Sequence, residues 1–382
     1  MNVNKWQFSR QDTKALKGVA ILLMLMHHSM AFPDRIPQKY EFAVSSSGLK
    51  HLILVGSFGK ICVAIFMFLG GLGLAKQIQA NKFHFLKKVW GLYRVYWRVF
   101  FIFVPLGFLF FSRQPKYTQA FMWNRFARFS FDKFIQNLTG YAATYNGEWW
   151  FIRAFIAAIL LGTIYYYLTE KIHIVYVETG LVLFISVITV KFLPALIKLD
   201  TFSSLASSYL WTQLFMPDTF VCAYLFGIVF GKYDIFASIR SLFSSYSSIN
   251  RALIGLMLIV SAFYFQEKVF SNLSDMMLII TPVFMTGCIL LLDLCKPLCK
   301  VMQFFGGLST NMWLTHTFFC YYFYPFAIVV FWSRNPIVAY LTLLAITVFA
   351  SVFLDKFYFS IEKLGVKLRK KIKGIKIDKV KY

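Results

Sequence analysis

A chain of 382 residues that is 59% hydrophobic and only 15% charged is not an ordinary soluble protein, because soluble domains carry about 25% charged residues. The mean hydropathy of +0.63 indicates an integral membrane protein instead. A net charge of +24 is also found in nucleic-acid-binding proteins, but here the basic residues gather between apolar segments. We therefore expect the lipid bilayer, and not nucleic acid, as the partner of this charge.

Apolar segments of about 20 residues, the length that crosses a bilayer as a helix, recur along the chain. They predict an all-α membrane protein with ten transmembrane helices, at residues 16–32, 52–75, 89–111, 149–168, 173–190, 210–231, 250–266, 276–293, 308–332 and 336–358. With ten spans both termini lie on one side of the membrane. That side carries most of the Lys and Arg residues, which predicts that both termini are cytoplasmic.

The first predicted span contains two adjacent histidines. A polar ring inside a membrane helix is costly, and it therefore indicates a functional site. Lys17 and His28 are eleven residues apart, which in a helix is about three turns, or ~16 Å, with an angular offset of only about 20°. The two side chains therefore share one helix face. We interpret His28 as the candidate catalytic residue and His27 as a structural or orienting residue.

The longest predicted outside loop, at about residues 112–148, ends just before the fourth predicted span. Glu148 at this mouth either hydrogen-bonds sugar hydroxyls or pairs with Arg153 inside the span, and the sequence leaves both open. Trp150 is placed where tryptophan commonly anchors a membrane edge. We take Glu148, Trp150, Arg153 and, on a late span, His316 as candidates for binding an acceptor substrate.

The end of the chain is a Lys-rich run from Lys363 to Tyr382. We expect residues 10–360 to form one membrane domain and residues 361–382 to form a basic cytoplasmic tail that lies against anionic lipid. The six cysteines predict no disulfide framework. The sequence contains no set of residues with the spacing of a metal site, so we expect no metal.

Four segments resemble, in order, the acyltransferase-3 family of bacterial integral-membrane O-acyltransferases. Lys17 and His28 have the spacing of that family's basic residue and histidine. Residues 85–97 are similar to its basic start of the third helix, residues 220–233 to its Gly-Lys-Tyr helix end, and residues 307–316 to its Ser…Trp-Leu-x-His helix.

One of these segments departs from the family pattern. The family often has two basic residues three positions apart before the third helix. In this chain Lys88 fits the first position, Gly91 occupies the second, and Arg94 follows one turn later.

The resemblance implies an O-acyltransferase of the bacterial plasma membrane that has only the membrane domain. It would move an acyl group, most often acetyl, from cytoplasmic acyl-CoA to a hydroxyl of a surface polysaccharide or glycolipid. His28 would act as general base or as covalent acyl carrier. The candidate acyl-CoA contacts are basic side chains near the cytoplasmic face, at Lys17, Lys87, Lys88 and Arg94.

Two other functions remain open at this point. A transporter or flippase for a sugar or a lipid-linked anionic substrate also needs charge inside the membrane, but it does not need acyl-CoA. A lipid-directed acyltransferase of the membrane-bound O-acyltransferase type also uses an intramembrane histidine. The position of His28 in the first span argues against that second alternative.

Overall fold

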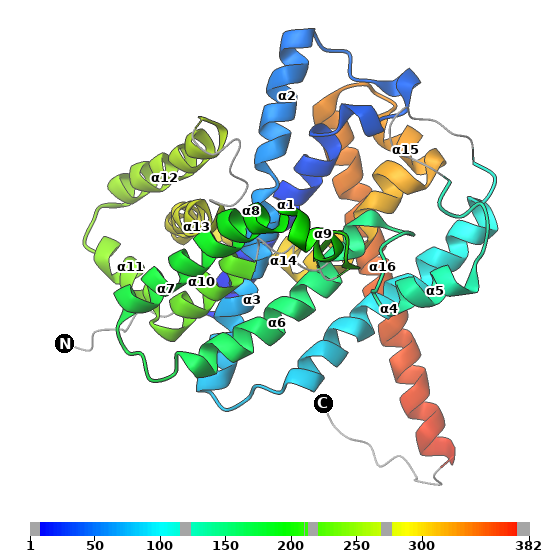
Figure 1. The fold of residues 1–382 in the computed structure, drawn as a ribbon. Helices are drawn as coiled ribbons and strands as arrows, with labels where there is room; N and C mark the ends of the chain where they lie inside the picture. Colours follow the sequence, from blue (N-terminus) through cyan, green and yellow to red (C-terminus); the bar gives the residue numbers. More distant parts are fainter. Residues whose placement is uncertain (1–7, 115–123, 210, 213–220, 269–276, 373–382) are drawn as a thin grey trace.

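The computed structural model describes residues 8–114, 124–209, 211–212, 221–268 and 277–372, and these residues contain helices and no strand. The expected all-α fold is confirmed for this part of the chain (Figure 1). The helices are α1 (Arg10–Met30), α2 (Ser46–Phe58), α3 (Ile61–Gln79), α4 (Phe85–Phe110), α5 (Phe131–Leu138), α6 (Trp150–Leu168), α7 (Val175–Val187), α8 (Leu193–Ile197), α9 (Ser203–Ala206), α10 (Val221–Lys232), α11 (Ile235–Phe243), α12 (Ser248–Lys268), α13 (Met277–Leu294), α14 (Lys296–Thr317), α15 (Tyr324–Phe331) and α16 (Pro336–Ile372).

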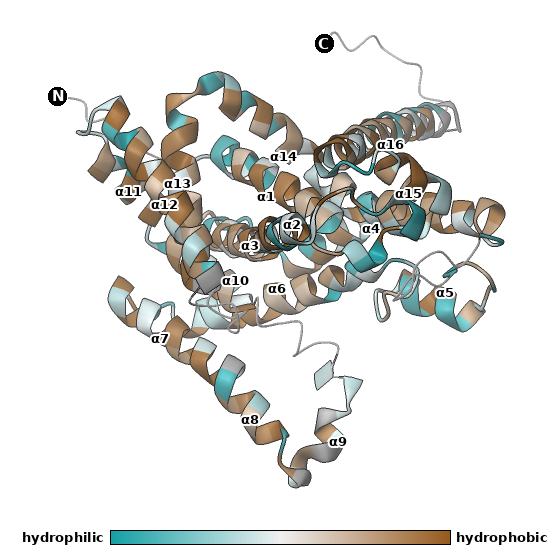
Figure 2. Cartoon of the chain, turned by 90° about the horizontal axis from the view of Figure 1, so that it is seen from above, coloured by the Kyte–Doolittle hydropathy of each residue, from teal (hydrophilic) through white to brown (hydrophobic). Residues whose placement is uncertain are grey.

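Five helical segments are long and apolar enough to cross a membrane, or up to seven if each of two bent pairs is one span. Three of the other expected spans fall on α1, which has four charged residues in its first eight positions, and on the shorter apolar helices α7 and α13. Part of the expected span 210–231 lies outside the described residues. Length and composition therefore support five to seven of the ten expected spans. Figure 2 shows the apolar colouring of the long helices.

The expected span 308–332 is not one straight helix. α14 and α15 meet at an angle of 89°, and a π-helical turn at Phe318–Tyr322 followed by the extended residue Phe323 separates them. Pro325 lies at the start of α15, where its missing N–H group cannot continue the hydrogen-bond ladder of α14.

The backbones of helices α1 and α14 are in direct contact where the two helices cross. A Cβ atom on Gly18 would lie 1.9 Å from the carbonyl oxygen of Met302, and one on Gly306 would lie 1.7 Å from that of Lys14. Small residues at such a crossing let two membrane helices approach closely. Because His28 and His316 each lie ten residues beyond one of these glycines, the crossing brings the two histidines to the same level.

Two buried ionic clusters tie other helices together. Arg240 of α11 donates to Asp12 and to Asp293 at 2.7 Å each, which joins the start of α1 to the end of α13. Burial alone would raise the pKa of Asp12, but the hydrogen bonds from Arg240 and Ser9 outweigh it and hold that pKa below its ordinary value. In the second cluster, Lys232 contacts Glu178 and donates to backbone carbonyls that follow α6.

The last helix extends beyond the others. α16 continues past residue 360 to Ile372, and its end projects away from the helix bundle in Figure 1. Residues 373–382 of the expected basic tail lie outside the described residues. Seen from above in Figure 2, α7, α8 and α9 form a strip along one edge, while α1 and α3 lie near the centre.

The crossing of α1 and α14 predicts that alanine substitutions at two neighbouring glycines have very different effects on the stability of the protein. Gly306→Ala forces its new methyl group against the Lys14 carbonyl and should destabilise the protein by about 2 kcal/mol, a typical cost of overpacking. At Gly307 the nearest atoms belong to the flexible end of the Lys14 side chain, at 2.9 and 3.1 Å. Gly307→Ala should therefore be neutral. Thermal unfolding in detergent measures both, and equal shifts would contradict the close crossing.

Candidate active site

Two histidines meet where α1 and α14 end. The ring centroids of His28 and His316 are 4.8 Å apart, and both side chains are buried. The Nδ1 atom of His316 lies 2.7 Å from the carbonyl oxygen of Trp313, so this nitrogen is the N–H donor and the other is an acceptor. That acceptor, Nε2, has no hydrogen-bond partner among the described residues. The pair therefore carries an unused proton acceptor beside His28.

A carboxylate faces His28 from the loop before α6. Oε2 of Glu148 is 3.7 Å from Nε2 of His28, and its other oxygen is 3.9 Å from Nη1 of Arg35. The Arg35 guanidinium also stacks over the ring of Phe32 at 3.9 Å. A carboxylate beside an imidazole stabilises the imidazolium that forms when the ring accepts a proton. Arg35 balances the negative charge of Glu148 while the imidazole is neutral.

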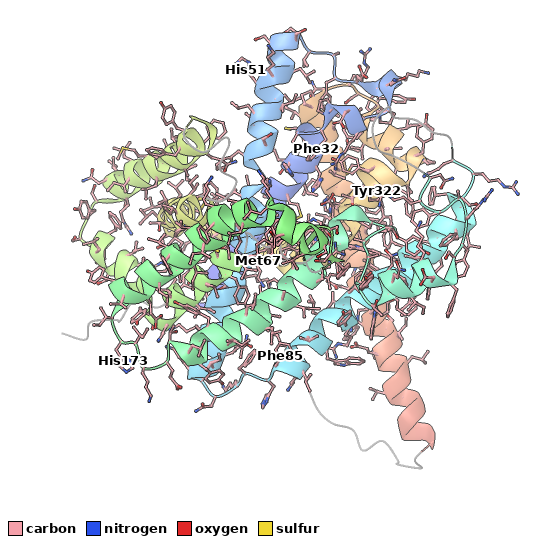
Figure 3. All side chains as sticks on the ribbon, viewed as in Figure 1. Phe32, His51, Met67, Phe85, His173 and Tyr322 are labelled. Carbon is pink, nitrogen blue, oxygen red and sulfur yellow. The ribbon has the colours of Figure 1, made fainter. Side chains whose placement is uncertain are left out.

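The position of Glu148 is fixed by the buried residue Asn146. The side-chain oxygen of Asn146 accepts hydrogen bonds from the backbone N–H of Glu148 at 3.1 Å and from the Thr317 hydroxyl at 2.9 Å. The indole N–H of Trp149 donates to the carbonyl of Leu314 at 3.1 Å, and Gly147 donates to the hydroxyl of Tyr322 at 3.1 Å. The loop is therefore fastened to the end of α14. Figure 3 labels Tyr322 in the bend and Phe32 beyond the end of α1.

A small cavity opens beside His28, and we call it the histidine chamber. It has a volume of about 170 Å³. Its lining combines charged and polar side chains with apolar ones. Its lining includes His27, His28, Arg35, Lys60, Glu148 and Trp150, together with Met24, Phe151 and Trp313. Side chains of both positive and negative charge therefore line the space next to His28.

A much larger cavity lies further along α1, toward its first turn, and we call it the basic cavity. Its volume is about 930 Å³. Six of the lining side chains are cationic and none is an Asp or Glu. The cations are Arg10, Lys14, Lys17, Lys76, Lys82 and Lys88. A cavity of this size is at the upper end of the range for small-molecule sites, and its charge suits an anionic ligand.

A third cavity, which we call the tyrosine cleft, shares Trp150 with the histidine chamber. It has a volume of about 560 Å³ and is lined by Tyr141, Trp150, Arg153 and Tyr209, among others. The rings of Tyr141 and Tyr209 stack with their centroids 4.0 Å apart. Because Trp150 lines both spaces, the cleft and the chamber are neighbours.

Comparison with known proteins identifies the family. The family model described as an acyltransferase domain, that of the acyltransferase-3 family, matches residues 12–356, which is most of the chain. The chain belongs to the acyltransferase-3 family. The predicted family is thereby confirmed, and the protein is a multi-pass membrane acyltransferase. No significant match is found among curated proteins or among solved structures.

In this acyltransferase the predicted site residues fall into three groups. Lys17 and Lys88 line the basic cavity, whereas Lys87 and Arg94 are exposed and are not among its lining residues. His28, Glu148 and Trp150 line the histidine chamber. The third group lies outside both spaces: Arg153 lines the tyrosine cleft, and His316 is buried behind His28. Their roles stay predictions.

Some residues of the site were not predicted from the acyltransferase sequence. Arg35 follows the first span in a short loop, and Met24 and Trp313 look like ordinary apolar residues of their helices. His27, expected to be structural, approaches the carbonyl oxygen of Gly56 to 2.9 Å through Nδ1. The one sequence feature that could have indicated Arg35 is a basic residue soon after the helix that carries His28.

The fastening of the Glu148 loop predicts the effect of removing the Asn146 amide. Asn146→Ala leaves the Thr317 hydroxyl and the Glu148 N–H without their acceptor in a buried place, which should lower the free energy of unfolding by about 2 kcal/mol. The control is Asn250→Ala in α12, where the side chain is exposed and the shift should be close to zero. Thermal unfolding of the two variants in one detergent tests this. A similar melting temperature for both would mean that Asn146 does not hold the loop.

Proposed function

We propose that this protein moves an acyl group from acyl-CoA to a hydroxyl of an extracytoplasmic carbohydrate. The supporting observation is that the basic cavity and the histidine chamber adjoin along one face of α1. Met24, Phe151 and Trp313 line both of them. A ligand that enters with anionic groups in the basic cavity can therefore extend a thin arm toward His28.

The basic cavity suits the nucleotide end of coenzyme A. Phosphate groups bind most strongly to fixed cations that also donate hydrogen bonds, and this cavity offers Lys17 and Lys88 from two different helices. The rise of an α-helix makes the distance from Lys17 to His28 about 16 Å. An extended pantetheine arm has a similar length, so the thioester would reach the chamber while the phosphates stay with the lysines.

The tyrosine cleft suits the acceptor. Aromatic rings with polar neighbours are typical of sites that bind one face of a sugar ring, because the ring has apolar C–H faces and polar hydroxyl edges. Tyr141, Trp150 and Arg153 supply both kinds of group. A hydroxyl that passes Trp150 would arrive between Glu148 and His28.

The transfer needs a base for the hydroxyl proton and a group that stabilises the positive charge which this base acquires. Nε2 of His28 takes the proton from the acceptor hydroxyl while the oxygen attacks the thioester carbonyl. The C–S bond then breaks, CoA leaves as a thiolate, and this thiolate takes the proton back from the imidazolium. Glu148 stabilises the imidazolium between these two proton transfers. The products are the ester and free CoA.

His28 could also carry the acyl group itself. In that route the imidazole nitrogen attacks the thioester and CoA leaves as a thiolate. The acceptor hydroxyl then displaces the acyl group from nitrogen, and the proton it loses neutralises the thiolate. Both routes consume one thioester and one hydroxyl. Radiolabel on the protein in the absence of acceptor distinguishes the covalent route from the direct one.

The same proposal places the protein in the bacterial plasma membrane with both termini in the cytoplasm. Ten spans would follow if α1, α7 and α13 also cross the membrane and if the segments 210–231 and 308–332 each form one span. The excess of Lys and Arg on the side of the termini supports this orientation. Lys17 and Lys88 would then face the compartment that contains acyl-CoA.

Removing the imidazole of His28 should abolish transfer. In reconstituted protein supplied with radiolabelled acetyl-CoA and a glycan acceptor, we expect His28→Ala to lower CoA release at least about 100-fold, the usual contribution of a general base. His51→Ala, which changes an exposed histidine of α2, is the matched control and should retain activity. Turnover by His28→Ala would exclude His28 and direct attention to His316.

Substitutions of two adjacent lysines test the proposed donor site. Lys88 lines the basic cavity and Lys87 does not, although the sequence nominated both. We expect Lys88→Ala to raise KM for acetyl-CoA about tenfold, the loss of one charge-assisted hydrogen bond. Lys87→Ala should leave KM within twofold. Equal effects of the two substitutions, or none, would show that phosphate binds somewhere else.

A further inference from the structure

We infer that three side chains between the basic cavity and the histidine chamber limit the length of the acyl group that this protein transfers. We call Met24, Phe151 and Trp313 the constriction. They come from α1, α6 and α14, and of the residues that line either space they alone line both. The inference rests on the proposed function, because it concerns the acyl end of an acyl-CoA donor. It assigns an acetyl-sized group as the substrate.

The constriction is well packed. Phe151 and Trp313 meet edge to face, with ring centroids 5.2 Å apart and an angle of 73° between their planes. Such aromatic pairs stabilise their geometry beyond simple burial. Trp313 and Met24 are 7% and 6% exposed, so neither can swing aside without displacing its neighbours. The packing therefore holds these side chains in place between the two spaces.

Further contacts hold Trp313 of α14 and Phe151 of α6 in place. The carbonyl oxygen of Trp313 accepts a hydrogen bond from Nδ1 of His316 at 2.7 Å. Phe151 follows the fastened Glu148 loop directly and contacts Phe155 one turn later, with centroids 5.5 Å apart. Widening the opening would thus disturb the same contacts that position Glu148 and His316.

The chamber beyond the constriction is too small for a long hydrocarbon chain, and charged side chains form part of its lining. Its volume of about 170 Å³ is below the range of about 300–1,000 Å³ that is usual for ligand sites. An acyl-CoA presents its acyl group first, so the acyl chain must enter this space together with the acceptor hydroxyl. A longer chain would press against Arg35, Lys60 and Glu148 and remove water from their charges, which is costly.

Size and polarity therefore act together. The acetyl group of a thioester passes the constriction and places its carbonyl carbon beside His28. The same coenzyme with a six-carbon chain still binds through its phosphates in the basic cavity, but its carbonyl carbon stays short of the imidazole. Hexanoyl-CoA should thus be a poor donor and a competitive inhibitor of acetyl transfer.

The experiment compares donors of increasing chain length in reconstituted protein. CoA release is measured with acetyl-CoA, butyryl-CoA and hexanoyl-CoA at saturating concentration, with the same glycan acceptor. The wild type should use acetyl-CoA at least about tenfold faster than hexanoyl-CoA, since each methylene in a tight pocket changes the rate by about 10-fold or more. Phe151→Ala should raise the ratio of the hexanoyl rate to the acetyl rate at least about tenfold.

The matched control is Phe155→Ala. This phenylalanine lies one turn further along α6 and lines the basic cavity without lining the chamber. Its removal should leave the ratio of the two rates unchanged, whatever it does to the rates themselves. If Phe151→Ala fails to fold, Met24→Ala tests the same constriction from α1 and should shift the ratio in the same direction.

Several outcomes would overturn the inference. Equal use of acetyl-CoA and hexanoyl-CoA by the wild type would show that nothing limits chain length. The same change of ratio in Phe151→Ala and Phe155→Ala would show that the constriction is not the cause. In both cases acetyl transfer itself persists, so the proposed function stands. No CoA release from any donor by folded wild-type protein would instead overturn the proposed function, and the inference with it.

Discussion

The backbone contact between α1 and α14 is the constraint on which the site depends. Gly18 and Gly306 bring the two helices so close that a methyl group at either position would meet a carbonyl oxygen. From this crossing the helices continue for ten residues to His28 and His316. The same crossing brings Trp313 opposite Met24. The pairing of the two histidines and the positions of two members of the constriction thus follow from one small-residue contact.

The polar groups near His28 are tolerated because nearly all of them have partners. Charged and polar side chains are expensive inside a membrane protein unless they pair. Glu148 faces His28 and Arg35, and Asn146 uses its side-chain oxygen for Glu148 and Thr317. The exception is Nε2 of His316, which has no partner among the described residues. An unsatisfied acceptor at this depth is retained at a cost, which is expected where a proton has to move.

The sequence predicted those parts of the site that depend on a single helix. The shared face of Lys17 and His28 follows from helical spacing alone, and the mouth at Glu148 follows from the position of a carboxylate before an apolar run. Adjacent residues such as Lys87 and Lys88 point about 100° apart on a helix, and spacing cannot say which of them faces inward. The structure orients Lys88 into the basic cavity and leaves Lys87 exposed.

The features that escaped prediction all depend on contacts between distant segments. The 89° bend after α14 needs the π-helical turn and Pro325 together, whereas hydropathy shows only a continuous apolar run. Trp313 and Phe151 have the composition of core residues, and their position between two cavities follows from the crossing of three helices. Arg35 reaches Glu148 only because both loops close over the same helix end.

In the proposed reaction this arrangement would keep an anionic donor and a neutral sugar acceptor in separate spaces, and neither substrate would have to cross the membrane. A basic cavity without acidic lining residues attracts a polyanion, and a polar chamber with an aromatic neighbour suits a neutral sugar hydroxyl. An opening as wide as the basic cavity would let the whole donor molecule through and would connect the two sides of the membrane. In the proposed reaction, a narrow passage between the packed apolar side chains of the constriction would let only a thin arm pass and would exclude water from the thioester. On this reasoning the same side chains that select a short acyl group also keep the membrane sealed, so chain-length selection follows from the need for a barrier.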